Sequence, residues 1–308
     1  MADVTDAAFR RLIAKYGKPH VMWTEFVSAD GLFMGGYDKL IRDLEFDETE
    51  RPIVAQFFTS KPEMMEKAAA LAVKLGFDGI DINMGCPDKS IEKQCAGAAM
   101  MKNPKLAREI IRAAKRGAIS AGKALPVSVK TRIGYSKNDL STWLPELLAE
   151  KPAVVTIHAR TRKEMSLVPA RWEHLKEAVE IRNKMGSKTL IFGNGDVKDI
   201  DDAYVKAKES GADGVMLGRA IFGSPFLFNT SKKMTDLSLK ERLEIMLEHT
   251  RLFEQLLGDV KNFAIMKKHY KAYVNNFEGA AELRAKLMET KNADEVEEIV
   301  KNYLSTCI

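Results

Sequence analysis

The sequence predicts an α/β protein made of a (β/α)8 TIM barrel followed by an all-helical C-terminal domain. Over residues 1–231, short runs rich in β-branched and apolar residues alternate with stretches of helical periodicity, which is typical of a parallel sheet connected by crossover helices. From Ser238 onward only helical periodicity remains, and it opens with Ser238-Leu-Lys-Glu241, which has the form of a capping box. We therefore expect a barrel domain at 1–231 and a helical domain at 232–308.

The expected strands lie at 21–26, 53–58, 79–84, 126–131, 153–158, 189–193 and 214–217, and the expected helices of the barrel at 5–16, 62–75, 104–121, 140–149, 172–185 and 198–210. Several strands are continuous in apolar residues, as strands buried on both faces are. Pro62 and Pro104 suit the first turns of their helices. Seven strands are one short of a complete barrel. The missing one should precede the helix near Thr5, so we expect the first barrel strand to be missing or truncated.

Composition places the chain among globular proteins. Of its 308 residues, 45% are hydrophobic and 30% charged, and no low-complexity tract interrupts them. No apolar run approaches the roughly 18 residues of a membrane span, and the acidic start is unlike a signal peptide, so we expect a cytoplasmic protein with no membrane partner.

The three cysteines are odd in number and lack metal-ligand spacing, which argues against a disulfide framework and a metal site. The net charge of +5 is compatible with a polyanionic partner. We expect a monomer with no obligate protein partner.

Polar residues end every expected strand. In a (β/α)8 barrel the functional residues lie where strands end and loops begin. A single polar strand end usually reflects solvent exposure, but seven in series favour a site. They are Thr24-Glu25, Gln56, Asn83-Met-Gly-Cys86, Lys130-Thr-Arg132, His158-Ala-Arg160-Thr-Arg162, Gly193-Asn-Gly-Asp196 and Gly218-Arg219.

The last two strand ends are similar to a phosphate cradle. Loops after the final strands of such barrels bind phosphate through glycine N–H groups and a helix N-terminus. Lys130 could place a positive charge where the pyrimidine edge of a flavin becomes anionic on reduction, and Gln56 could hydrogen-bond that edge. Solvated strand ends remain the alternative. His158 could stack on a ring or contact phosphate, although a structural histidine is the commoner outcome.

Cys86 lies between Gly85 and Pro87, just past a strand, where a packing cysteine is unusual. A thiol of ordinary pKa, about 8.5, stays protonated at neutral pH and can donate a proton, whereas a nucleophilic role needs a lowered pKa. The residues alone leave both roles open. Cys95 and Cys307 are assigned to packing and to a frayed terminus.

A basic stretch, Met266-Lys-Lys-His-Tyr-Lys-Ala-Tyr273, mixes lysines with aromatic rings. This composition suits phosphate contacts beside base stacking. A charged helix face is an equally good reading of the same residues.

Taken together, these segments resemble the tRNA-dihydrouridine synthase family from Met1 to about Tyr303. The resemblance rests on 1–10, Asp81-Ile-Asn-Met-Gly-Cys-Pro87 with Ala96-Gly-Ala-Ala99, Val129-Lys-Thr-Arg132, His158-Ala-Arg-Thr-Arg162, Gly193-Asn-Gly-Asp196, Gly218-Arg219, Met266-Lys-Lys-His269 and Ala281-Glu-Leu-Arg284. A generic flavin barrel would share the phosphate loops but not the cysteine segment or this tail.

The resemblance implies an FMN-dependent oxidoreductase that reduces uridines in tRNA, with NADPH or NADH as reductant and Cys86 as the proton donor to C5 of the base. FMN would have Met1 and Ala2 near its edge, Gln56 and Lys130 on the isoalloxazine and His158 alongside. Its phosphate would contact Asn194, Gly195, Asp196, Gly218 and Arg219. The base or ribose would contact Asn83 and Arg132, while Lys267, His269 and Arg284 would bind RNA.

The chain departs from the family pattern at its start, because relatives carry an apolar strand ending in Ala-Pro just before the residue that matches Met1. Two other interpretations compete with a synthase. One is a flavin barrel acting on a free pyrimidine, against which the helical tail counts. The other is an RNA-binding relative that has lost activity, which the missing first strand makes conceivable.

Overall fold

The computed structural model describes residues 3–306 and forms two compact units. The larger unit contains Phe26–Ile41 and Pro52–Gly218, and the other contains Met1–Glu25, Arg42–Arg51 and Arg219–Ile308. Met1, Ala2 and Cys307, which the sequence analysis singled out, lie outside the described residues.

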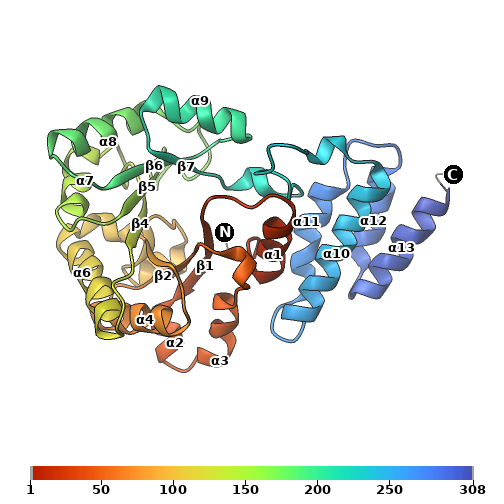
Figure 1. Ribbon diagram of the computed structural model, residues 1–308, viewed down its shortest axis with the longest axis horizontal. Helices are drawn as coiled ribbons and strands as arrows, with labels where there is room; N and C mark the ends of the chain where they lie inside the picture. The colour runs from red at the N-terminus through yellow and green to blue at the C-terminus, as the bar shows by residue number, and fades with distance from the viewer. Residues whose placement is uncertain (1–2, 307–308) are drawn as a thin grey trace. The chain divides into compact units, whose positions relative to one another are not determined.

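A parallel sheet organises the larger unit (Figure 1). Its strands are β1 (Met22–Ser28, of which 26–28 belong to this unit), β2 (Ile53–Phe58), β3 (Gly79–Asn83), β4 (Val127–Arg132), β5 (Val154–His158), β6 (Leu190–Asn194) and β7 (Gly214–Met216). They follow one another across the sheet in chain order, and every pair from β2 to β7 is parallel. This order confirms the predicted α/β barrel class, and the strand bounds agree with prediction to within two residues. Within residues 3–306 the sheet has seven strands, one fewer than a complete (β/α)8 barrel.

Helices connect the strands of this unit. They are α2 (Ala29–Phe33), α3 (Tyr37–Leu40), α4 (Pro62–Lys74), α5 (Lys89–Lys93), α6 (Pro104–Ser120), α7 (Leu140–Leu148), α8 (Glu173–Lys184) and α9 (Ile200–Ser210). Pro62 and Pro104 occupy first turns, as predicted. Helix α4 packs closely on α6, where a Cβ on Gly117 would lie 2.0 Å from the carbonyl oxygen of Glu66. Only glycine permits that approach.

The two faces of the sheet differ in polarity. Ile80, Ile82, Val127 and Val129 alternate along β3 and β4 with polar side chains and are buried, as a face covered by helices requires. The intervening positions carry Asp81, Asn83, Ser128, Lys130 and Arg132, and the strand register aligns them with Gln56 on β2, His158 on β5 and Asn194 on β6. The interior face of the sheet is therefore polar toward its carboxyl edge.

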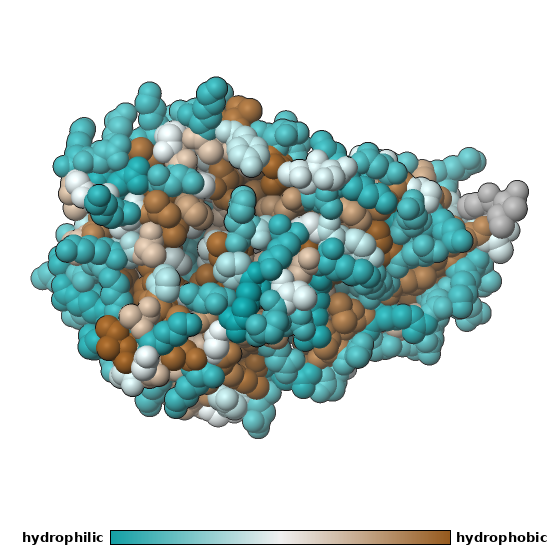
Figure 2. Space-filling model, in the orientation of Figure 1, coloured by the Kyte–Doolittle hydropathy of each residue, from teal (hydrophilic) through white to brown (hydrophobic). Residues whose placement is uncertain are grey.

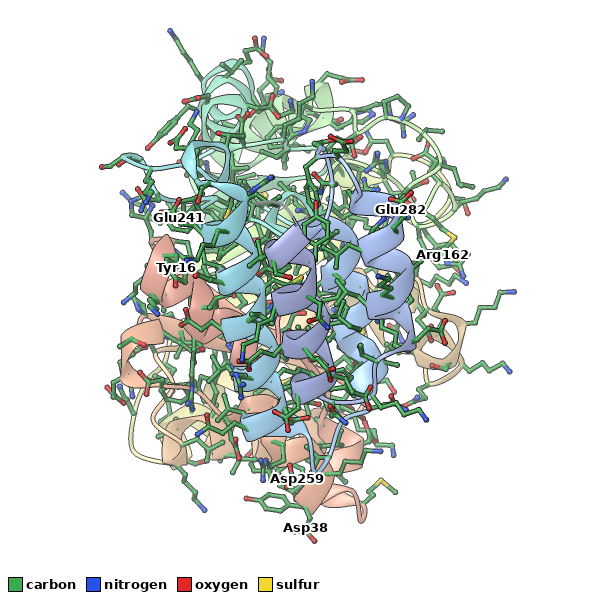
Figure 3. All side chains as sticks on the ribbon, turned by 90° about the vertical axis from the view of Figure 1, so that its right-hand side faces the viewer. Tyr16, Asp38, Arg162, Glu241, Asp259 and Glu282 are labelled. Atoms are coloured by element: carbon green, nitrogen blue, oxygen red, sulfur yellow. The ribbon has the colours of Figure 1, made fainter. Side chains whose placement is uncertain are left out.

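The smaller unit is helical. It contains α1 (Ala7–Tyr16), α10 (Leu239–Leu257), α11 (Met266–Tyr273), α12 (Ala280–Glu289) and α13 (Ala293–Thr306). Figure 3 shows α10, α12 and α13 side by side, with Glu241 near the start of α10 and Asp259 just beyond its end. The predicted capping box is present, because Ser238 accepts from the N–H of Glu241 while the Glu241 carboxylate accepts from that of Ser238.

Aromatic and charged side chains share the core of this unit. The ring of Phe9 stacks on that of His249 and meets His269 edge-on, with centroid distances of 4.8 Å in both cases. Beside them, Nε of Arg10 donates to Glu50 at 2.7 Å, and both side chains are buried. The face shown in Figure 2 is mostly hydrophilic, with scattered apolar patches. Among the described residues, no helix is both long and apolar enough to cross a membrane.

Candidate active site

The loop after β3 is held from three sides. Oδ1 of Asn83 accepts the backbone N–H groups of Gly85 at 3.1 Å and Cys86 at 2.9 Å. On the far side of Cys86, its carbonyl oxygen accepts the N–H of Ala98 at 2.9 Å. Gly97 has φ +59, and a Cβ there would lie 2.8 Å from the same carbonyl, so this turn requires glycine. Nε of Arg132 closes the loop by donating to the Gly85 carbonyl at 2.8 Å.

The Cys86 thiol lies in an apolar setting. It packs against the buried cluster of Phe58, Ile91 and Ala96, beside Phe26. Burial raises the pKa of the thiol above its ordinary value, and this effect outweighs the opposing influence of the Asp88 backbone N–H and of the cations Arg132 and Lys130. The thiol therefore stays protonated at neutral pH, the state that an acid needs and a nucleophile does not.

Lys130 supplies a cation at the same edge of the sheet. Its Nζ lies 3.4 Å from Oδ1 of Asn194 on β6. Burial, followed by repulsion from Arg132, lowers the pKa of Lys130 to about 8. Gln56 is also buried, with its amide turned to Asp81 and Asn83. The cation of Lys130 makes this part of the site suited to a group that gains negative charge.

His158 is neutral at physiological pH. Burial is the main cause, and the cations Lys130 and Arg132 add to it, so the pKa of His158 falls to about 2. Nη1 of Arg160 lies 3.1 Å from Nε2 of His158. Because a guanidinium only donates, Nε2 accepts and the ring proton lies on Nδ1. Arg160, which is buried, also forms an ion pair with the exposed Asp196, whose carboxylate accepts the N–H of Ala170 at 2.9 Å.

The β6 loop, Asn194-Gly195-Asp196, is shaped to accept a group against its backbone. Gly195 has φ +123, and a Cβ there would come within 2.9 Å of both Ala170 and the His158 ring. Nε1 of Trp172 fixes the Gly195 carbonyl at 2.8 Å. These contacts explain why position 195 requires glycine, and the nearby cations Lys130 and Arg160 suit the phosphate of a bound cofactor. Gly218 and Arg219 follow β7, and Arg219 begins a 3-10 turn at Arg219–Ile221 in the other compact unit.

Two predicted substrate residues are occupied by internal contacts. Arg132 is 6% exposed and, besides Gly85, its guanidinium donates to the carbonyls of Thr161 and Met165 at 3.1 Å each. Asn83 is 7% exposed and holds the Cys86 loop. Both residues lie in the site, where they shape its loops.

The three predicted RNA contacts lie in the helical unit and differ in exposure. His269 is fully buried, and burial together with Lys268 lowers its pKa to about 3. The structure therefore places His269 in the core, because α11 turns residues 266, 269, 270 and 273 inward. Lys267 is partly exposed. Nη1 of Arg284 donates to the Val274 carbonyl at 2.7 Å.

The three predicted RNA contacts left out two lysines of the basic stretch 266–273 that the sequence analysis had already found suited to phosphate contacts. Lys268 and Lys271 on the exposed face of α11 line, with Phe222 and Ala272, a concavity of about 500 Å³. Residues three apart lie on the same face of a helix, so the spacing of Lys268 and Lys271 indicated in the sequence that both lie on the face opposite the buried positions of α11. Asp81 was also missed, since it is completely buried within β3. Among residues 3–306, no group of three or more His, Cys, Asp or Glu side chains could hold a metal.

Comparison with known proteins identifies the family. The model of the family described as Dihydrouridine synthase (Dus) matches residues 1–307. The chain belongs to the dihydrouridine synthase family. This confirms the resemblance expected from the sequence and the expected enzyme class, a flavin-dependent oxidoreductase.

Individual dihydrouridine synthase relatives match along nearly the whole chain. A "Probable tRNA-dihydrouridine synthase 2" from Bacillus subtilis (strain 168) is 38% identical over 306 residues, which cover 98% of this chain and 92% of that protein. A "Probable tRNA-dihydrouridine synthase" from Staphylococcus aureus (strain MRSA252) is 37% identical, covering 98% and 91%. Among solved structures, an old yellow enzyme homologue from Zymomonas mobilis aligns with a TM-score of 0.49 at 14% identity, covering 76% of this chain and 86% of that one.

Proposed function

We propose that this chain is a tRNA-dihydrouridine synthase, which reduces the C5–C6 double bond of specific uridines in tRNA to 5,6-dihydrouridine. The reductant is NADPH or NADH, the cofactor is FMN, and Cys86 donates the proton to C5. The observation that carries the proposal is a protonated thiol fixed beside a cationic, polar rim in a chain of this family. The names of the relatives support tRNA as the substrate.

The residues of the site fit FMN. Asn194, Gly195 and Asp196 would hold the phosphate together with Gly218 and Arg219, and Lys130, whose Nζ lies 3.4 Å from Oδ1 of Asn194, supplies a cation beside this loop. Lys130 and Gln56 would lie against the ring, and the neutral His158 beside it. When bound, the reduced flavin supplies the hydride that C6 of the base accepts. Met1 and Ala2, also expected near the flavin, lie outside the described residues.

Cys86 completes the reduction on the other carbon. Its S–H bond breaks as a C5–H bond forms, so the base gains one proton and the sulfur is left as a thiolate. The raised pKa of Cys86 makes this proton available at neutral pH and favours recovery of a proton from solvent afterwards. A thiol already ionised at neutral pH could not play this part.

The helical domain, 232–308, binds the RNA in this proposal, and the barrel domain, 1–231, binds the flavin. A base inside folded tRNA has to leave its stack to reach such a site, and contacts elsewhere must offset that loss. Lys267 and the neighbouring exposed lysines of α11 supply phosphate contacts. Arg284 acts at the same domain, and His269 acts from inside it by supporting α11. Asn83 and Arg132 shape the pocket for the base.

The test begins with the purified protein. We expect a flavin absorption band that NADPH bleaches, and dihydrouridine in tRNA transcripts incubated with both. Reduction of free uracil or dihydroorotate chemistry without activity on tRNA would identify a small-molecule flavin enzyme. Tight tRNA binding without flavin would identify an inactive RNA-binding relative. Either of these results contradicts the proposal.

A further inference from the structure

A continuous hydrogen-bond chain links a fully buried carboxylate to the Cys86 loop. Nε2 of Gln56 donates to Oδ2 of Asp81 at 2.6 Å, and Nδ2 of Asn83 donates to Oε1 of Gln56 at 3.1 Å. Oδ1 of Asn83 then accepts the N–H of Cys86 at 2.9 Å. The side chains of Gln56 on β2 and Asn83 on β3 thus connect the Asp81 carboxylate to the backbone of Cys86.

Only one orientation of the Asn83 and Gln56 amides gives every group in this hydrogen-bond chain a suitable partner. At one end the backbone N–H of Cys86 can only donate, so the Asn83 atom that faces it must be oxygen. The amide nitrogen of Asn83 then faces Gln56, which must present its own oxygen. Its nitrogen is left to face position 81, where an ionised carboxylate can only accept. An ionised aspartate at position 81 favours this orientation of both amides, because it offers only acceptors to Gln56.

Asp81 has a second partner that lies off the chain. Oγ of Ser128 on β4 donates to Oδ1, the other oxygen of the same carboxylate. Burial raises the pKa of Asp81 to about 6, and the two donors oppose that rise. The carboxylate is therefore ionised at neutral pH, with one oxygen assigned to Gln56 and one to Ser128.

We propose that Asp81 is a positioning residue which, through Gln56 and Asn83, fixes the backbone that holds the Cys86 thiol. Without an acceptor at position 81 the Gln56 amide loses its hydrogen bond to the carboxylate, and the reversed orientation becomes more accessible. In the reversed orientation its nitrogen faces the nitrogen of Asn83, and Asn83 can no longer present oxygen to Cys86. The importance of this for catalysis rests on the proposed function of Cys86, whereas the effect on the thiol itself does not.

The experiment reads the thiol directly. In a Cys95→Ser, Cys307→Ser background, Cys86 is the sole cysteine, and its alkylation by iodoacetamide is followed from pH 7 to 10. Asp81→Leu removes the acceptor at the buried end of the hydrogen-bond chain, and Gln56→Leu removes the amide at its middle. Asp81→Asn keeps a side-chain oxygen that can accept from Gln56. Ser128→Ala is the matched control, because it removes a partner of the same carboxylate without touching the chain.

We expect Asp81→Leu and Gln56→Leu each to raise the alkylation rate about tenfold, as loss of a network hydrogen bond predicts. The apparent pKa of Cys86 should fall toward its ordinary value in both. The double variant should show no further change, because each cut breaks the same chain. Asp81→Asn and Ser128→Ala should stay within about threefold of the parent.

Alkylation of Gln56→Leu at the parent rate would overturn the proposal, and this arm remains decisive if Asp81→Leu does not fold. A Ser128→Ala rate as high as that of Asp81→Leu would also overturn it, because general loosening of the core would then explain both. If the thiol responds as expected but dihydrouridine formation does not need Cys86, the positioning role stands and the proposed role of Cys86 fails.

Discussion

The ammonium group of Lys130 lies 3.4 Å from the side-chain oxygen of Asn194, so a cation from β4 meets an amide from β6 at the carboxyl edge of the sheet. Asn194 turns its nitrogen the other way, toward the Met216 carbonyl at 2.7 Å. The contact therefore presents Asn194 as an acceptor and holds Lys130 over the sheet. A partly buried cation of this kind has consequences for both stability and cofactor binding.

Replacing Lys130 should change how stability depends on pH. Its pKa of about 8 in the folded protein lies below the value of about 10.4 in an unfolded chain. The unfolded state therefore binds more protons between these values, and stability should rise as pH increases through that window. Lys130→Met should remove the rise and stabilise the flavin-free protein below pH 8 by on the order of 2 kcal/mol. Urea unfolding at pH 7 to 10 measures it, and parallel profiles for the two proteins would contradict the pKa assignment.

Removing the Cys86 thiol should separate the two halves of the reaction. In Cys86→Ala we expect NADPH to bleach the flavin normally, while dihydrouridine formation falls by about 100- to 10,000-fold, the usual contribution of a general acid. Cys95→Ala is the control, because that side chain is exposed and outside the β3 loop. Modification of tRNA by Cys86→Ala at the parent rate would show that another group supplies the proton.

Gly195→Ala should damage the phosphate cradle. The substitution combines positive φ with a Cβ placed 2.9 Å from Ala170 and His158, so we expect a loss of about 2–4 kcal/mol in stability and loss of copurified flavin. Gly186→Ala is the matched control, since Gly186 has φ +61 but nothing within 4 Å, and it should cost only about 1 kcal/mol with flavin retained. Equal effects at both positions would mean that backbone strain alone, and not the cradle, explains the loss.

Charge reversal on α11 should weaken tRNA binding in a salt-dependent way. Each of Lys267→Glu, Lys268→Glu and Lys271→Glu should reduce affinity and lower the slope of log K against log salt by about 0.7 to 0.9, as expected for loss of one phosphate contact. Lys240→Glu on α10 is the control, because Lys240 is also an exposed lysine of the helical unit. A binding titration at several salt concentrations measures the slopes. Identical slopes for all four variants would place the RNA elsewhere.

His269→Ala should behave as a core substitution and leave the salt dependence unchanged. The ring is fully buried between Phe9 and His249, and neither ring nitrogen has a hydrogen-bond partner within the described structure. We expect a loss of about 2–4 kcal/mol in stability, typical of a cavity, measured by urea unfolding. Unchanged stability together with a lower salt slope would return His269 to the RNA-binding surface.

The fold was readable from the sequence because each element carries a local signal. Strands such as Ile53–Phe58 are continuous apolar runs, and α4 and α6 begin at prolines. The short helices α2, α3 and α5 were not predicted, since four or five residues are too few to show a helical period. The candidate site residues at the strand ends were also predictable from local sequence, because a polar side chain after an apolar run indicates the edge of the sheet.

By itself the sequence determined the family, the parallel α/β architecture and the position of Cys86 at a strand end, since all of these depend on motifs and periodicity along the chain. Only the tertiary structure decided which polar residues face one another. It put His269 in a core although lysines surround it in sequence, because a helix face is set by what packs against it. It also joined Asp81 to Cys86 through Gln56, a residue 25 positions away from Asp81. Contacts across neighbouring strands are governed by register, which no single segment contains.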